Sequence, residues 1–289
     1  MTIRVILVPL AGEARDKAQL SAAFALADRL NAHVDGVFVE PDPYDAISSL
    51  GLFAGADAID RISREATKHA KQRRQLAESA FRTACTNANA HITEAALGTD
   101  RLSARWRTLS GLHDDLVGRE GRYADLVVFS RGEVGSDRHI RRAFEQALLN
   151  TGRPLLLVPT SPRPSVQTVG VAWDGSVAAA RAVANALPLL RMAATVKVLT
   201  VESAPTQPDD LDRLSEYFVW HGIACEGEHI ESKDASIGTL VLETAKEEEL
   251  DLLVMGGYGH SPRRDLTLGS VTYHVLSSPD ANFSVFMAH

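Results

Sequence analysis

The stretch Asp251-Leu-Leu-Val-Met-Gly-Gly-Tyr-Gly-His-Ser-Pro-Arg-Arg-Asp-Leu-Thr-Leu-Gly-Ser270 decides the fold. Its first five residues predict a short buried strand, glycines follow at once, and Gly269-Ser270 opens a helical pattern. Glycine lets a phosphate approach main-chain N–H groups closely, and a helix start adds further donors and a partial positive charge. The stretch therefore predicts a strand, a backbone-exposing loop and a helix. The alternative is a tight connection that needs glycine only for its turns.

Length and composition limit the classes of protein that the whole chain can form. The 289 residues are 45% apolar and 23% charged, as in one large or two ordinary globular domains. No apolar run approaches the ~20 residues of a membrane span, and the N-terminus lacks the pattern of a secretory signal. We therefore expect a cytoplasmic protein without a membrane partner. A net charge of −7 disfavours nucleic acid as a partner. Cys85 and Cys225 lie far apart, which argues against a disulfide framework.

Strand and helix patterns alternate along the chain. Before residue 160 the alternation predicts strands at 3–8, 34–39, 104–109, 125–130 and 154–158 and helices at 14–30, 56–88, 112–118 and 140–150. After residue 166 it predicts strands at 168–173, 196–201, 224–230, 251–255 and 283–287 and helices at 177–190, 209–221, 237–248 and 269–277. The segment Asp42–Gly55 reads as a long loop, either functional or an insertion folded onto the surface.

The two halves of the chain repeat one pattern. Ala124-Asp-Leu-Val-Val-Phe129 matches Leu250-Asp-Leu-Leu-Val-Met255, and a Pro/Ser-rich linker separates the halves. We expect a first domain at 1–160, a linker at 161–166 and a second domain at 167–289. The alternation predicts an α/β fold of parallel sheets with helices on both faces. In such sheets ligands bind beyond the carboxyl ends of the strands, so Asp174 and Gly256 are expected to flank a crevice.

Two motifs resemble the universal stress protein family. The spacing Gly256-x2-Gly259-x9-Gly269-Ser270 resembles the nucleotide-binding signature of that family, and Val169-Gly-Val-Ala-Trp-Asp-Gly-Ser176 resembles its opening strand and turn. With the repeat, the resemblance covers nearly the whole chain as a tandem pair. It implies two doubly wound, Rossmann-like sheets of five parallel strands, similar to those of adenine nucleotide α-hydrolases, and ATP as the ligand.

The resemblance also implies roles for individual residues of the second half. Asp174 would meet the adenine or ribose side, and the backbone near Val201 would border adenine. Gly256 and Gly259 would lie against ribose and phosphate, and Gly269 with Ser270 would hold the outer phosphates. From charge and position alone we add His260 and Arg263, which could equally be solvated loop residues.

The chain departs from the family pattern in both halves. After the third strand of the second half, Ser232-Lys-Asp-Ala235 replaces a Gly-Asp/Asn-Pro step that many ATP-binding members carry, so that Lys233 contacts phosphate or the site is altered. In the first half, Ala11-Gly-Glu13 replaces the Asp-Gly-Ser turn, and Ser130-Arg-Gly-Glu-Val-Gly-Ser136 lacks a later Gly-Ser. The first half is thus expected to be a degenerate partner, which leaves a single ATP site per chain.

Three functions compete at this point. The first is an ATP-binding stress-response protein in which nucleotide tunes conformation or partner choice, with Mg2+ arriving on the phosphates and little hydrolysis. The second is a tandem scaffold that acts through dimerisation and protein contacts without nucleotide. The third is an enzyme that uses ATP to activate a substrate, but no catalytic residue and no metal-ligand spacing is recognisable among the histidines.

The final strands of the two halves, 154–158 and 283–287, are candidates for pairing with each other. Their apolar content suits a buried interface, so the two domains of one chain would associate as separate subunits do in single-domain relatives. Whether the chain also forms a homodimer is left open by the sequence.

Overall fold

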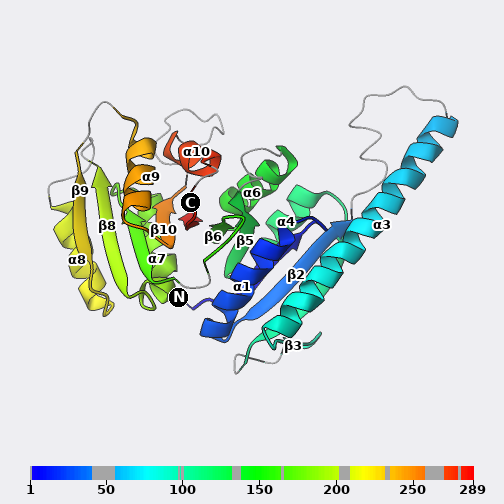
Figure 1. Ribbon diagram of the computed structural model, residues 1–289, viewed down its shortest axis with the longest axis horizontal. Coiled ribbons are helices and arrows are strands. Elements are labelled where there is room, and N and C mark those ends of the chain that lie inside the picture. The colour runs from blue at the N-terminus through cyan, green and yellow to red at the C-terminus, as the bar shows by residue number, and fades with distance from the viewer. Residues whose placement is uncertain are drawn as a thin grey trace.

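A computed structural model shows one mixed sheet of 11 strands with helices on both faces (Figure 1). The structure describes residues 2–40, 56–96, 98, 101–131, 138–163, 166–201, 209–231, 235–257, 270–278 and 281–289. The predicted long loop at 42–55 lies outside these residues.

The elements of the first half follow the predicted alternation. They are β1 (Val5–Leu10), α1 (Asp16–Leu30), β2 (His33–Glu40), α3 (Ala56–Asn87), β3 (His91–Ile92), β4 (Ser103–Ser110), α4 (His113–Gly121), β5 (Leu126–Ser130), α6 (Arg138–Asn150) and β6 (Leu155–Val158). The two-residue strand β3 was not predicted. Its residues are exposed, and a strand this short carries no recognisable period.

The second half repeats the same order. Its elements are β7 (Thr168–Ala172), α7 (Val177–Leu190), β8 (Thr195–Val201), α8 (Asp210–Trp220), β9 (Glu226–Ile230), α9 (Ile237–Glu247), β10 (Leu252–Gly256), α10 (Ser270–Ser277) and β11 (Ser284–Ala288). Each of them lies within a few residues of its predicted position.

The strand order is β3-β4-β2-β1-β5-β6-β11-β10-β7-β8-β9. In the first half β1 lies between β2 and β5, and in the second half β7 lies between β8 and β10, which is the doubly wound arrangement. All pairs within a half are parallel, as βαβ crossovers require. The predicted sheets of the two halves are therefore present, and they are continuous with each other.

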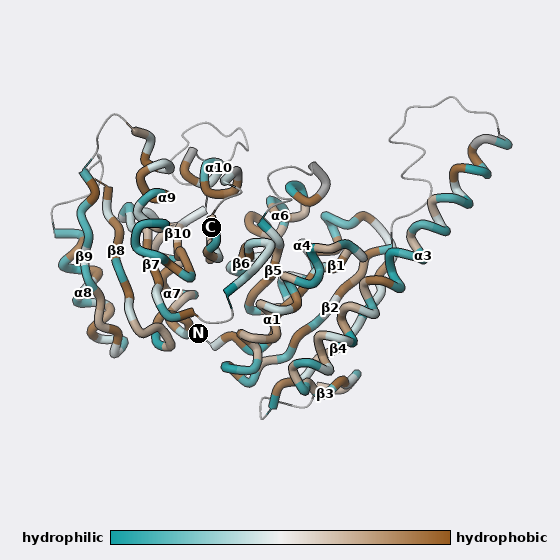
Figure 2. Tube along the Cα trace, in the orientation of Figure 1, coloured by the Kyte–Doolittle hydropathy of each residue, from teal (hydrophilic) through white to brown (hydrophobic). Residues whose placement is uncertain are grey.

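Two hydrophobic cores lie on the two faces of this sheet. One face is covered by α1 and α3 of the first half and by α7 and α8 of the second. The other face is covered by α4, α6, α9 and α10. Because both cores contain residues from both halves, neither half has a separate core at the junction. Figure 2 shows hydrophobic residues concentrated along the central strands, whereas β9 at the end of the sheet is largely hydrophilic.

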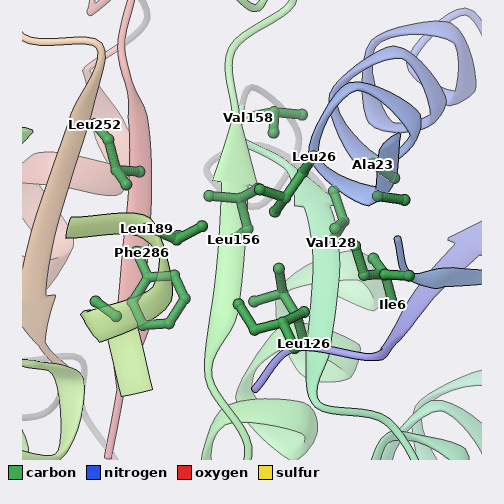
Figure 3. Packing of buried hydrophobic residues seen from close by; sticks show 14 of the residues in the cluster. Ile6, Ala23, Leu26, Leu126, Val128, Leu156, Val158, Leu189, Leu252 and Phe286 are labelled. Carbon is green, nitrogen blue, oxygen red and sulfur yellow. The ribbon is translucent and has the colours of Figure 1, made fainter. Parts of the chain in front are cut away.

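The halves are joined by antiparallel pairing of β6 with β11. Leu157 lies opposite Val285, Leu156 opposite Phe286 and Leu155 opposite Met287. Phe286 is fully buried and packs among apolar side chains from both halves (Figure 3). The predicted pairing of the two final strands is thus confirmed.

A repeated aspartate fixes the start of each half. Asp125 accepts hydrogen bonds from the backbone N–H groups of Arg4 (2.8 Å) and Val5 (3.0 Å). Asp251 accepts them from Gln167 (2.9 Å) and Thr168 (3.1 Å). Burial raises the pKa of Asp251, but these amides and Arg163 outweigh that effect and lower it. The Asp-Leu repeat seen in the sequence therefore ties the start of β5 to the start of β1, and the start of β10 to the start of β7.

Cys85 is buried and Cys225 is partly buried, and both are free thiols. Burial raises the pKa of Cys85 to about 11, so its thiol stays protonated. No helix among the described residues is long and apolar enough to cross a membrane.

Phe286→Ala tests the junction. We expect this substitution to lower the free energy of unfolding by roughly 3–5 kcal/mol, because it leaves a cavity between the two halves. Equilibrium unfolding in urea, followed by circular dichroism, measures the change. Leu76→Ala is the control, since Leu76 is 61% exposed and its loss should cost less than about 0.5 kcal/mol. Equal effects of the two substitutions would contradict the importance of the junction.

Candidate functional site

The second half has a topological switch point between β7 and β10. The two strands are parallel neighbours, with Leu252 opposite Val169 and Val254 opposite Val171. The helix that follows β7 packs on one face of the sheet, and the helix that follows β10 packs on the other. The chain therefore diverges from this pair of strands, and doubly wound sheets bind ligands in a crevice beyond the carboxyl ends of such strands.

A tight turn connects β7 to α7. The side chain of Asp174 accepts a hydrogen bond from the backbone N–H of Ser176 (3.0 Å), and Gly175 has a φ of 70°. The hydroxyl of Ser176 accepts a bond from the N–H of Ala179 (3.0 Å) and so caps α7. The Asp-Gly-Ser sequence thus places an exposed carboxylate directly beside a helix N-terminus.

Gly256 brings the end of β10 against that helix. A Cβ atom on Gly256 would lie 2.8 Å from the backbone nitrogen of Ala179 and 3.0 Å from the backbone carbon of Ala178. Real Cβ atoms essentially never approach so closely, so only glycine permits this contact. The structure therefore brings together the neighbourhoods of Asp174 and Gly256, which the sequence placed on either side of the crevice.

Val201 ends β8, the neighbour of β7 on the side away from β10. Its side chain is buried. The preceding residue, Thr200, donates its hydroxyl to the carbonyl of Glu228 (3.2 Å) on β9. Val201 therefore lies at the carboxyl edge, one strand away from Asp174 along the sheet.

The other predicted residues are described in part or not at all. Ser270 begins α10, but its side chain is outside the described residues. Gly259, His260, Arg263 and Gly269 lie outside them altogether, and so does the step at 232–234 with its Lys233.

Three further residues at this edge were missed by the sequence analysis. Trp173 has a buried indole Nε1 without a hydrogen-bond partner among the described residues. A Cβ on Gly175 would lie 3.2 Å from the Asp210 carboxylate, so the start of α8 reaches the turn. Gly257 donates its N–H to the carbonyl of Ala288 (2.7 Å), and its missing side chain admits Leu148 from the first half. One signal in the sequence was available for Trp173 and Gly257, which is that they directly neighbour Asp174 and Gly256.

The corresponding edge of the first half is filled by the chain itself. The buried carboxylate of Asp16 accepts hydrogen bonds from the backbone N–H groups of Ala11 (3.1 Å), Gly12 (2.7 Å) and Glu13 (3.3 Å). Burial raises the pKa of Asp16, although these amides act in the opposite direction. The backbone N–H groups that follow β1 are therefore already hydrogen-bonded to the carboxylate of Asp16.

Helix α3 closes this edge further. A Cβ on Gly12 would collide with the backbone carbonyl of Arg73, and the Arg73 guanidinium bonds both the carbonyl of Ala11 and the carboxylate of Glu13. At the exit of β5, Arg131 is 2% exposed, and its guanidinium lies 5.2 Å from the ring centre of Phe283. Burial lowers the pKa of Arg131 to about 10. Among the residues that the structure describes, the backbone donors after β1 are thus bonded within the chain, and Arg131 is buried after β5.

No group of three or more His, Cys, Asp or Glu side chains suited to a metal ion occurs in the described part of the chain. The carboxyl ends of β7 and β10 present the backbone at the start of α7 and the exposed carboxylate of Asp174. Gly256 allows the end of β10 to approach α7 closely. These groups suit the binding of a polar ligand at the edge of the sheet.

The strand order defines a doubly wound α/β protein duplicated within one chain. The family model of the universal stress protein family matches residues 223–285, which include the glycine signature. A universal stress protein from Archaeoglobus fulgidus DSM 4304 has a similar fold, with a TM-score of 0.67 at 15% identity over 99% of this chain and 96% of that one. A putative universal stress protein from Pseudomonas aeruginosa UCBPP-PA14 is similar with a TM-score of 0.58 at 14% identity, over 99% and 93% of the two chains.

No curated protein sequence matches the chain. The resemblance to universal stress proteins is nevertheless confirmed over residues 223–285 by the family model, and the solved structures show that the whole chain shares their fold.

Gly256→Ala tests the close contact at the crevice. The added methyl group would meet backbone atoms of α7, so we expect a loss of about 1–3 kcal/mol in the free energy of unfolding. Gly118→Ala in α4 is the control, because its Cβ would make only ordinary contacts, at 3.7 Å or more, with Gln146 of α6. Thermal unfolding of the two variants measures the difference. A Gly256 variant as stable as the Gly118 variant would show that the contact is not restrictive.

Proposed function

We propose that the second half binds ATP, and that the protein acts as a nucleotide-dependent regulatory module of the universal stress protein type. The observation that carries this proposal is the approach of Gly256 to the first turn of α7, directly beside the Asp174 turn. A phosphate chain beside this helix start would lie near the positive end of a helix dipole, and the glycine-rich segment that follows β10 would supply further backbone N–H donors. The family match over residues 223–285 supports the same region.

In this proposal Asp174 hydrogen-bonds the ribose or adenine, and the backbone at Val201 borders the adenine ring. Gly256 and Gly259 admit the ribose and first phosphates, and Gly269 with Ser270 holds the outer ones. His260 and Arg263 would add positive charge near the phosphates. Mg2+ would be held mainly by the phosphates, since Mg2+ usually keeps several waters and few protein ligands.

We propose one ATP per chain, in the second half. In the first half the amides at the exit of β1 already bind the carboxylate of Asp16, and the Arg73 carbonyl lies against Gly12. A nucleotide phosphate there would have to displace a buried carboxylate and a helix. Hydrolysis would be slow, because the described part of the site contains no recognisable water-positioning base with a matched metal site.

The nucleotide content of freshly purified protein, measured by acid release and chromatography, tests this function. We expect close to one ATP per wild-type chain and none in Gly269→Glu, whose acidic side chain would occupy and repel the outer phosphates. Asp174→Ala should retain less ATP than the wild type, because a ligand contact is lost.

Glu13→Ala is the matched control, since Glu13 follows β1 in the first half as the Asp174 turn follows β7 in the second. It should leave the ATP content unchanged. Two ATP per chain would overturn the single site. No ATP, together with no binding of added Mg-ATP, would overturn the function and favour the tandem scaffold. Steady turnover of ATP with an acceptor would favour an enzyme instead.

A further inference from the structure

A cavity of about 410 Å³ opens on the first half of the molecule, at the amino ends of β1, β2 and β4. Its polar lining includes Arg4, His33, Asp35, Arg105, Arg107 and Glu120. The segment 93–96 and Tyr123 form further parts of its wall. The volume lies within the range of about 300–1,000 Å³ that is usual for small-molecule sites. None of these residues belongs to the proposed ATP site, which is built entirely from the second half.

A buried carboxylate organises two arginines in this cavity. Asp35 on β2 is 4% exposed and accepts hydrogen bonds from Arg105 (Nε 3.3 Å, Nη2 2.9 Å) and from Arg107 (Nε 3.1 Å, Nη2 2.6 Å). Arg107 also donates through Nη1 to Glu120 (2.7 Å) on α4. Each guanidinium is thus held in a fixed orientation by two bonds to one carboxylate.

One arginine still has donor capacity toward the cavity. Arg105 makes its hydrogen bonds through Nε and Nη2, and its Nη1 has no hydrogen-bond partner within the described part of the chain. Its side chain is 33% exposed, whereas that of Asp35 is 5% exposed. The lining also contains Arg4, Glu94 and Glu120, so its arginines and its carboxylates are equal in number. What distinguishes Arg105 is a fixed guanidinium with an unused donor, which is suited to an oxyanion.

The second half shows that the fold does not require this arrangement of charges. Asp35 is the third residue of β2 and lies beside Arg105 of β4, and the third residue of β8 is Lys197, which lies beside Glu226 of β9. Lys197 forms an ion pair with Glu248. The same position of the repeat therefore carries opposite charges in the two halves. In the first half the carboxylate of Asp35 lies between two arginines, and in the second half the ammonium group of Lys197 lies among carboxylates.

We propose that the cavity binds a small organic anion, with a carboxylate or phosphate group held by Arg105 and the body of the molecule resting against Ala95, Ala96 and Tyr123. Guanidinium recognises both groups through the same planar fork of donors, so the shared chemistry is an oxyanion on a metabolite-sized ligand. Tyr123 is 80% exposed and offers an aromatic face at the wall of the cavity.

Isothermal titration of the full chain with two probes, citrate and glycerol 3-phosphate, tests this site at constant ionic strength. We expect saturable binding of at least one probe with one site per chain. Binding of citrate would indicate a carboxylate ligand, and binding of glycerol 3-phosphate would indicate a phosphate ligand. Arg105→Gln should weaken that binding about tenfold or more, because a charge-assisted hydrogen bond is lost. Arg82→Gln removes an exposed arginine of α3 outside the cavity and should leave the affinity unchanged.

Tyr123→Ala guards against a folding defect in the Arg105 variant, since Tyr123 is highly exposed and its removal should not disturb the core. It should weaken binding about threefold or more while the melting temperature stays that of the wild type. Saturating ATP should leave the probe's affinity unchanged if the two sites are separate. Absence of saturable heat with both probes, displacement by ATP, or wild-type affinity in both cavity variants would overturn the proposal.

Discussion

The antiparallel pairing of β6 with β11 is the contact on which the rest of the structure depends. Without it, each half would end in an apolar edge strand whose unpaired N–H and C=O groups invite association. With it, the two sets of parallel strands form one sheet, and the cores on its two faces run through the junction. The placement of Leu148 against Gly257, and of Arg131 against Phe283, follows from the same pairing, because these residues come from opposite halves.

The two halves arrange the same edge of the sheet differently. In the second half, the Asp-Gly-Ser turn leaves the Asp174 carboxylate exposed, and Gly256 brings the end of β10 against the start of α7. In the first half the backbone donors after β1 bind Asp16, and a helix of 32 residues covers them through Arg73. The difference arises from a few side chains and the length of one helix, while the order of strands is the same.

Most of the fold could be predicted from the sequence, because alternation of strand and helix periods is a local property. The repeated Asp-Leu pattern also revealed the duplication, and its hydrogen bonds to the starts of β1 and β7 explain why it is present in both halves. The continuity of the sheet was predicted only as a pairing of final strands. The exposed two-residue strand β3 was missed, since it has no periodic signal.

The candidate site was less predictable, because its features depend on contacts between distant residues. Asp174 and Gly256 were found from spacing, but the closing of the first half by Arg73, some 60 residues from Gly12, has no signature in the sequence. The ion cluster around Asp35 likewise needs the register of β2 with β4, about 70 residues later in the chain.

The covalent link between the halves has a consequence for their evolution. Two identical subunits that pair through their final strands must present one surface to itself, so any change appears twice across the axis. Here each half has a single, permanent and non-identical neighbour, and their association does not depend on protein concentration. A substitution in one half therefore needs a compensating substitution only in the other half. That freedom accounts for the difference between Arg131, which follows β5, and Gly257, which follows β10. It also accounts for the opposite charges around Asp35 and Lys197.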